Sequence, residues 1–405
     1  MATGQEDTGT LHPVPGVRLA AVAAGIRKPG RLDLVVLELA AGSSCAGVFT
    51  RNAFCAAPVQ VAKVHLASTT PVALLINTGN ANAGTGEPGL VAARDCCNAL
   101  AAVAGVAPEA VLPFSTGVIG EPLPVERLCN ALPAAWQALD ASVWADAARG
   151  IMTTDTRPKA SSRQLQLAGR AVTITGITKG AGMIRPDMAT MLAFIATDMG
   201  MTTDETQTAV SRHADRSFNR ITVDGDTSTN DACMLIATGK SGLSYASLDA
   251  AARGKFDAAL EAVFVSLAQA IVRDGEGATK FVTVRVTGGA SSAECLAVAH
   301  TVGSSPLVKT ALFASDPNWG RILAAVGRAG IPDLDIARVT LHLDDVCIAS
   351  GGARSPDYTE AAGQAVFAKP EFTISIGLGR GDCEEHVWTC DFSHDYVTIN
   401  AEYRT

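Results

Sequence analysis

The sequence lacks the cysteine and histidine patterns that are typical of metal sites or disulfide frameworks. Its ten cysteines include no CxxC pair, and its seven histidines form neither an HExxH nor an HxH motif. Zinc sites and small disulfide-rich domains need closely spaced ligands or paired cysteines. We therefore expect buried free thiols and no structural or catalytic metal.

Basic clusters and long apolar runs are also missing. The chain has 32 Lys and Arg against 40 Asp and Glu, a net charge of -8, which argues against a nucleic-acid partner. The longest apolar stretch, AALEAVFVSLAQAIV, contains Glu261 and is too short to span a membrane. The first sixteen residues lack the basic and apolar regions of a signal peptide. We expect no membrane partner and a cytoplasmic location.

The length and composition indicate a globular protein of more than one domain. The chain has 405 residues, of which 48% are hydrophobic and 18% charged. Near residue 280 the pattern changes to strands with cleaner alternation of apolar and polar residues. We expect an N-terminal tail (1–15), a main α/β domain (16–279) and a smaller α+β domain (280–405).

Apolar runs bounded by Gly, Asn and Ser predict the individual elements. In the main domain the expected strands are 33–40, 46–54, 72–76, 111–120, 171–180, 191–198 and 232–239, and the expected helices are 90–103, 125–139, 202–217 and 256–273. Thr202 and Glu205 have the spacing of a capping box. In the C-terminal part the pattern predicts strands 280–288, 337–349, 371–379 and 387–393, with one helix at 305–313.

One junction between a loop and a strand is unusual. The segment KGAGMIRPDMATMLAFIATD, residues 179–198, runs from a Gly-rich loop into an apolar strand with Ala189 and Thr190 at the join. Thr190 could simply start the strand. However, a threonine hydroxyl becomes a useful nucleophile when a base is adjacent, and its own α-amine serves once the preceding peptide bond is cut. This alternative makes the Ala189–Thr190 bond a reaction site.

This segment resembles the autoprocessing site of the ornithine acetyltransferase family, also called the bifunctional glutamate N-acetyltransferases of arginine biosynthesis. Further blocks resemble the family in the same order: GVFTRNAFCAAPV, INTGNANAGTG, STGVIG, IMTTDT, TVDGDTSTND, VRDGEGATKF, SDPNWGR and INAEYRT. The resemblance implies a layered α/β sandwich of the ornithine acetyltransferase/aminopeptidase type with a smaller α+β C-terminal domain. It also implies cleavage into an α chain (1–189) and a β chain (190–405), with two of each in the assembly.

The implied reaction transfers acetyl from N2-acetyl-L-ornithine to L-glutamate. By resemblance, Thr190 is the nucleophile that carries the acetyl group, and its amine accepts the proton. Thr116 and Gly117 form the oxyanion hole through a hydroxyl and a backbone amide. No cofactor is bound, and acetyl-CoA is expected as a second acetyl donor.

The resemblance also implies a set of substrate contacts. Lys179 and Glu276 bind the charged ends shared by ornithine and glutamate. Thr153, Asn400 and Thr405 complete the contacts, although the sequence alone does not separate Thr153 from its neighbour Thr154.

Several alternatives stay open at this stage. Thr116 and Gly117 could form only a turn, and Lys179 and Glu276 could be surface charges. The protein could also be an ornithine acetyltransferase without acetyl-CoA activity, a related self-processing aminopeptidase, or a binding protein without catalysis.

Overall fold

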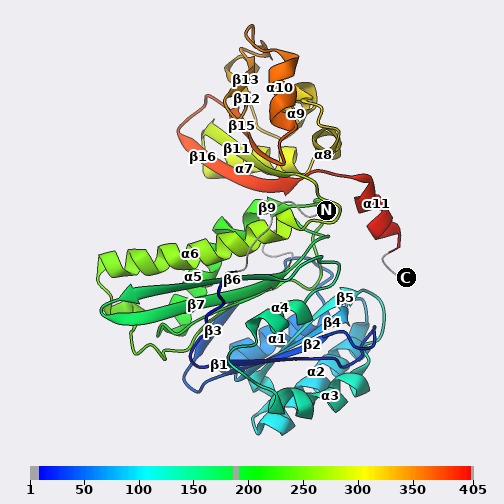
Figure 1. Cartoon of the computed structure of the whole chain (residues 1–405), viewed down its shortest axis with the longest axis vertical. Helices are drawn as coiled ribbons and strands as arrows, with labels where there is room; N and C mark the ends of the chain where they lie inside the picture. Colours follow the sequence, from blue (N-terminus) through cyan, green and yellow to red (C-terminus); the bar gives the residue numbers. More distant parts are fainter. Residues whose placement is uncertain (1–8, 186–190, 403–405) are drawn as a thin grey trace.

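The computed structural model describes residues 9–185 and 191–402. Three β-sheets and their helices make up the described part (Figure 1). Among these residues, no helix is both long enough and apolar enough to cross a membrane.

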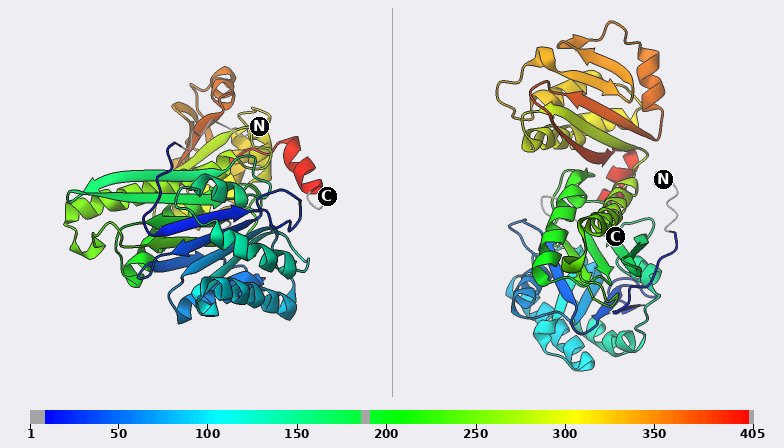
Figure 2. Two further views of the ribbon diagram at one scale, coloured as in Figure 1. Left: turned by 60° about the horizontal axis from the view of Figure 1, so that its bottom comes forward. Right: turned by 90° about the vertical axis from the view of Figure 1, so that its left-hand side faces the viewer.

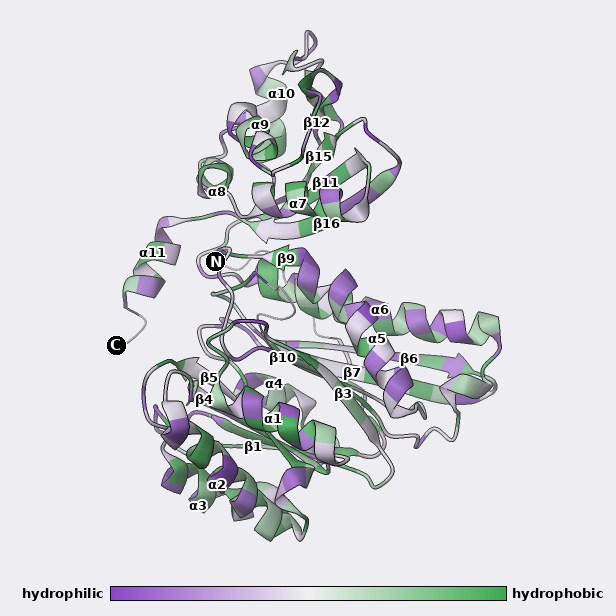
Figure 3. Ribbon diagram, turned by 180° about the vertical axis from the view of Figure 1, so that it is seen from behind, coloured by the Kyte–Doolittle hydropathy of each residue, from purple (hydrophilic) through white to green (hydrophobic). Residues whose placement is uncertain are grey.

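The first sheet has four strands and is covered on its outer face by helices. Its strands, in spatial order, are β1 (Val17–Val22), β2 (Leu34–Leu39), β4 (Ala73–Asn80) and β5 (Val111–Val118). The outer helices are α1 (Ala57–Ser68), α2 (Gly86–Ala104) and α3 (Val125–Gln137). Both polar and apolar residues occur along α2 and α3 (Figure 3), and their buried residues pack on the sheet in one cluster.

The second sheet has five strands and carries two long helices on its own outer face. In spatial order its strands are β3 (Ser44–Phe49), β10 (Ala232–Ala237), β8 (Leu192–Thr197), β7 (Arg170–Lys179) and β6 (Lys159–Leu167). The covering helices are α5 (Thr203–Arg216) and α6 (Ala250–Arg273). The capping box of Thr202 and Glu205 is confirmed at the start of α5.

The two sheets pack against each other through a shared apolar core (Figure 2). Phe114 of β5 and Phe194 of β8 meet edge to face across it, with their ring centroids 5.1 Å apart. Helix α4 (Trp144–Gly150) contributes Trp144 to the same core. Because both faces of β8 are covered, all six of its residues are buried. The result is a helix–sheet–sheet–helix sandwich, which confirms the expected α/β class.

The third sheet lies at the other end of the molecule (Figure 1). Its strands, in spatial order, are β14 (Ala353–Arg354), β13 (Val346–Ser350), β12 (Thr340–Leu343), β15 (Glu371–Gly377), β11 (Phe281–Gly289), β16 (Cys383–Cys390) and β9 (Ile221–Thr222). Alternate residues of β15 are buried because helices cover only one face. The division of the chain at residue 280 stays a prediction.

The helices of this region differ from the sequence-based expectation. One helix was expected, but the described residues contain α7 (Ser292–Gly303), α8 (Pro306–Phe313), α9 (Trp319–Gly327), α10 (Glu360–Phe367) and α11 (His394–Ala401). The buried residues of α7 include Cys295, Val298, Ala299 and Val302, whose spacing is helical and was readable in the sequence.

The single strand expected at 337–349 is also wrong. It is two antiparallel strands, β12 and β13, joined through Asp344, which has a positive φ of 47°. An Asp tolerates this left-handed conformation better than most residues, so Asp344 and the adjacent Asp345 mark a turn.

Candidate active site

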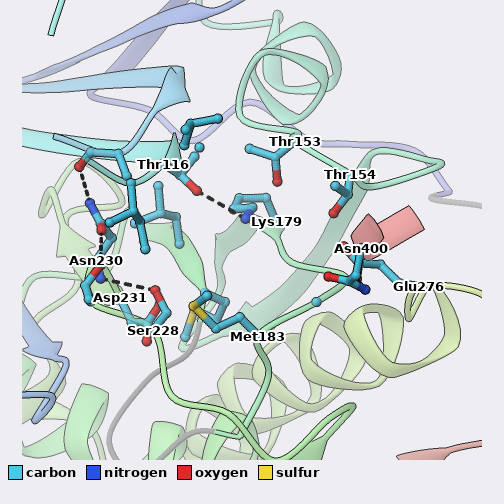
Figure 4. Close-up of a pocket in the computed structure, with 18 residues that line it drawn as sticks. Thr116, Thr153, Thr154, Lys179, Met183, Ser228, Asn230, Asp231, Glu276 and Asn400 are labelled. Carbon is cyan, nitrogen blue, oxygen red and sulfur yellow. Dashed lines mark hydrogen bonds between the residues drawn. The ribbon is translucent and has the colours of Figure 1, made fainter. Parts of the chain in front are cut away.

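A cavity of about 280 Å³ lies where strands of the first two sheets meet (Figure 4). Its walls come from the ends of β5 and β7, the start of β8, the loops after α4, β7 and α6, the loop before β10, and helix α11. Its lining residues include Thr116, Gly117, Thr153, Thr154, Lys179, Gly182, Met191, Ser228, Asn230, Asp231, Glu276 and Asn400.

The structure brings together the predicted site residues that it describes. Those that line the cavity are Thr116, Gly117, Thr153, Lys179, Glu276 and Asn400. Ala189, Thr190 and Thr405 lie outside the described residues. Met191, which follows Thr190 in the chain, lines the cavity, and its carbonyl accepts a hydrogen bond of 3.0 Å from the backbone of Ala232.

Thr116 and Gly117 lie at the end of β5, beside an irregular part of β4. Thr116 pairs with Thr78 and Gly117 with Gly79, and the register shifts at Asn80. Gly117 has a φ of +136°, and a Cβ there would lie 2.3 Å from the backbone carbon of Gly79. Only glycine fits this backbone conformation and this close approach. Thr116 therefore enters the cavity on a rigid, strand-supported backbone.

Lys179 reaches into the cavity from the end of β7. Its ammonium donates a hydrogen bond of 3.2 Å to Oγ1 of Thr116 (Figure 4). Burial lowers the pKa of Lys179 below its ordinary value, although the nearby charges of Asp155 and Asp231 oppose this effect. The lysine nitrogen is thus held next to a hydroxyl group in a confined space.

Glu276 supplies a carboxylate to the same cavity. It is 6% exposed, and its Oε2 accepts a hydrogen bond of 2.8 Å from Nδ2 of Asn400 in α11. The Thr154 hydroxyl is a second donor to this carboxylate. Burial raises the pKa of Glu276, and these two hydrogen bonds act against the increase.

Thr153 and Thr154, which the sequence does not separate, have different hydrogen-bond partners in the structure. Both residues line the cavity. Thr154 is hydrogen-bonded to Glu276, whereas the Thr153 backbone N–H donates to Asp155 at 2.9 Å. Which of the two hydroxyls contacts substrate stays a prediction.

The loop before β10 carries lining residues that the sequence analysis did not single out. Asn230 donates from its amide to the backbone carbonyls of Ala81 and Ser115, at 2.6 and 3.0 Å. Burial raises the pKa of Asp231 well above its ordinary value, against hydrogen bonds from Ser228 and the charge of Lys179. The polar run TSTND directly before an apolar strand was the available signal.

These groups suit a small molecule that carries both charges. A cation and a carboxylate in one cavity complement the α-carboxylate and α-ammonium of an amino acid. The Thr116 hydroxyl and the Gly117 backbone are suited to stabilise an oxyanion near them.

Comparisons with known proteins identify the family. The sequence model of the ArgJ family matches residues 18–405. The chain is 61% identical to the arginine biosynthesis bifunctional protein ArgJ of Pseudomonas syringae pv. tomato and 60% identical to that of Pseudomonas fluorescens, in each case over 100% of both chains. A crystal structure of ArgJ from Bacillus halodurans is 36% identical, with a TM-score of 0.49, and the match covers 52% of this chain and 99% of that one. The chain belongs to the ArgJ family.

Proposed function

We propose that this cavity transfers an acetyl group from N2-acetyl-L-ornithine to L-glutamate by way of an acetyl ester on Thr190. As an ArgJ protein the chain is an acyltransferase of arginine biosynthesis. The observation that carries the detailed proposal is the meeting of six predicted residues, from separate segments of the sequence, around one cavity.

The first half-reaction forms the ester. The Thr190 hydroxyl attacks the acetyl carbonyl of acetylornithine, and the α-amine of Thr190 accepts the hydroxyl proton. The Thr116 hydroxyl and the Gly117 amide stabilise the oxyanion of the tetrahedral intermediate. The C–N bond then breaks, and the proton passes to the leaving amine of ornithine.

The second half-reaction returns the acetyl group to an amine. The neutral α-amine of glutamate attacks the ester carbonyl, and the same two donors stabilise the oxyanion. The α-amine of Thr190 takes the proton that the glutamate nitrogen loses and passes it to the Thr190 oxygen as the C–O bond breaks. Lys179 and Glu276 serve both substrates because both carry an α-carboxylate and an α-nitrogen.

We further propose acetyl-CoA as a second acetyl donor, which fits the word bifunctional in the names of the relatives. An enzyme restricted to acetylornithine would give no acetylglutamate with acetyl-CoA as the sole donor. A self-processing aminopeptidase would release free acid whether or not glutamate is present. The assembly of two α and two β chains and the cytoplasmic location stay predictions.

The decisive experiment removes the proposed nucleophile. Thr190→Ala should give a single chain of 41.6 kDa without transferase activity, whereas Thr190→Ser should retain cleavage. In the wild type, brief exposure to acetylornithine followed by acid quench should add one acetyl group to the fragment that begins at Thr190, as seen by intact mass. Cleavage in the alanine variant, or a label on the fragment that ends at Ala189, would contradict the proposal.

A further inference from the structure

A buried lysine outside the cavity lies between two buried aspartates. Lys159, at the start of β6, places its Nζ 2.5 Å from Oδ1 of Asp155 and 2.6 Å from Oδ2 of Asp274. The three side chains are 1%, 0% and 0% exposed. Burying ions this deeply carries a large desolvation cost, which is offset only where charge pairing and hydrogen bonds are nearly complete.

The Asp155 carboxylate also accepts hydrogen bonds from the backbone of the segments that form the cavity wall. Its Oδ2 accepts a hydrogen bond of 2.9 Å from the backbone of Thr153, which lines the cavity. Its Oδ1 accepts one of 2.8 Å from the backbone of Gly180, the residue after Lys179. One carboxylate therefore connects the segment of Thr153 to the backbone that carries Lys179.

The Asp274 carboxylate connects Lys159 to the segment that carries Glu276. It accepts a hydrogen bond of 3.1 Å from the backbone of Thr156 and a second from the Thr156 hydroxyl. Asp274 precedes Glu276 by two residues, and the Glu276 backbone N–H donates to the carbonyl of Ala181 at 2.9 Å. Lys159 is thus the central ion of a cluster that joins the backbone supports of Lys179 and Glu276.

The charges around Asp155 and Lys179 are coupled. Burial raises the pKa of the Asp155 carboxyl, but the charges of Lys159 and Lys179 and its hydrogen bonds outweigh burial and hold that pKa well below its usual range. The charges of Asp155, Asp231 and Glu276 favour the charged form of Lys179, and that of Lys159 opposes it. Arg157 lies at the edge of the cluster, 4.0 Å from Oδ1 of Asp274.

We propose that Asp155, Lys159 and Asp274 are positioning residues that hold Lys179 and Glu276 at the spacing that an α-amino acid requires. The inference rests on the proposed function, because it assumes that these two residues bind the ends of the substrate. None of the three cluster residues lines the cavity, so their effect passes through the backbone and through the charge of Lys179.

The cluster should act on substrate binding more than on the chemical step. Asp155→Asn and Asp274→Asn keep the side-chain shape but remove one charge and part of the hydrogen bonding. Each should raise KM for acetylornithine and glutamate, and Kd for L-ornithine by calorimetry, on the order of tenfold, the loss expected for one charge-assisted contact. The value of kcat should change less.

Asp155→Asn should also change how ornithine binding depends on pH at the alkaline end. Removing the facing negative charge lowers the pKa of Lys179 further, so ornithine binding should weaken at a lower alkaline pH than in the wild type. A purely structural defect lowers the active fraction but leaves this pH dependence in place.

Asp198→Asn is the matched control. Asp198 is a buried aspartate, 3% exposed, that accepts a 2.8 Å hydrogen bond from the backbone of Thr173, in the part of β7 away from Lys179. Its replacement should alter the free energy of unfolding without changing Kd for ornithine or the alkaline pH at which ornithine binding weakens.

The outcomes separate the two proposals. The cluster variants that fold are compared with the wild type at equal concentrations of folded protein. If KM, Kd and the alkaline pH at which ornithine binding weakens are all unchanged, the positioning role is overturned. A wild type that binds ornithine without transferring acetyl would contradict the proposed function, while the binding comparison would still decide the role of the cluster.

Discussion

Lys179 donates a hydrogen bond to Thr116 across 3.2 Å, joining the end of β7 in one sheet to β5 in the other. A threonine hydroxyl has one proton, and accepting this bond leaves that proton free to donate into the cavity. The ammonium also polarises the hydroxyl and makes it a stronger donor. In the proposed function, the same lysine would therefore serve substrate binding and, through Thr116, oxyanion stabilisation.

Thr116→Val tests the donor. It keeps the shape of the side chain but removes the hydroxyl, so kcat of the cleaved enzyme should fall about 10²–10³-fold, the usual effect of losing one oxyanion donor. Thr116→Ser should recover most of the rate. Steady-state assays on equal amounts of cleaved protein measure this, and a valine variant with wild-type kcat would remove Thr116 from the mechanism.

Glu276→Gln tests the contact to the substrate nitrogen. KM for acetylornithine and for glutamate should both rise about tenfold or more, because one charged partner is lost in each complex. Self-cleavage, followed on a denaturing gel, should continue. An effect on only one substrate would show that the shared contact is wrong.

The raised pKa of Glu276 gives this contact a pH dependence. The carboxylate accepts a hydrogen bond from the substrate α-nitrogen, an amide in acetylornithine and an amine in glutamate, most strongly when it is ionised. Binding therefore weakens as the pH falls through a value above the ordinary 4.5 of a glutamate. In the wild type, KM should therefore begin to rise on acidification at a pH above the ordinary pKa of a glutamate. In Glu276→Gln this rise should be absent. Measuring KM from neutral pH downward on both proteins compares the two pH dependences.

Gly182→Ala tests the space that Glu276 occupies. A Cβ at Gly182 would lie 2.4 Å from Oε2 of Glu276, so the carboxylate must move. Because the crowded atom is the end of a flexible side chain, we expect a small change in Tm but a clear rise in KM for both substrates.

Gly254→Ala is the control for this glycine variant. Gly254 lies within α6, and nothing lies within 4 Å of its added Cβ. Alanine there should stabilise the helix by about 0.5–1 kcal/mol and leave KM unchanged. Equal kinetics in the two alanine variants would show that Gly182 does not control the Glu276 position.

The proposed base predicts a further pH profile. A free α-amine has a pKa of about 7.7–8.0, and a nearby ammonium such as that of Lys179 lowers it. The neutral amine is the active form, so kcat/KM for acetylornithine should rise with pH through this value or somewhat below it. A rate that is flat from pH 5 to 9, with chemistry limiting, is incompatible with the amine as base.

The candidate site residues came from the resemblance to the family, and three of them lie in local motifs at strand ends. STGVIG placed Thr116 and Gly117 at the end of an apolar run, and KGAG placed Lys179 at the end of another. Both runs are strands in the structure. Asp231 was missed because a carboxylate in a polar loop gives no local sign that the fold will bury it.

The sequence by itself determined the α/β class, most strands and helices of the sandwich and the family, and it proposed a list of candidate site residues. Hydrophobic periodicity and turn residues are local properties, so they are readable without the fold. Only the tertiary structure decided that Thr116, Lys179, Glu276 and Asn400 share one cavity and that Lys159 joins Asp155 to Asp274. Residues more than a hundred positions apart meet through sheet packing, and their distances, burial and charge coupling exist only once the chain has folded.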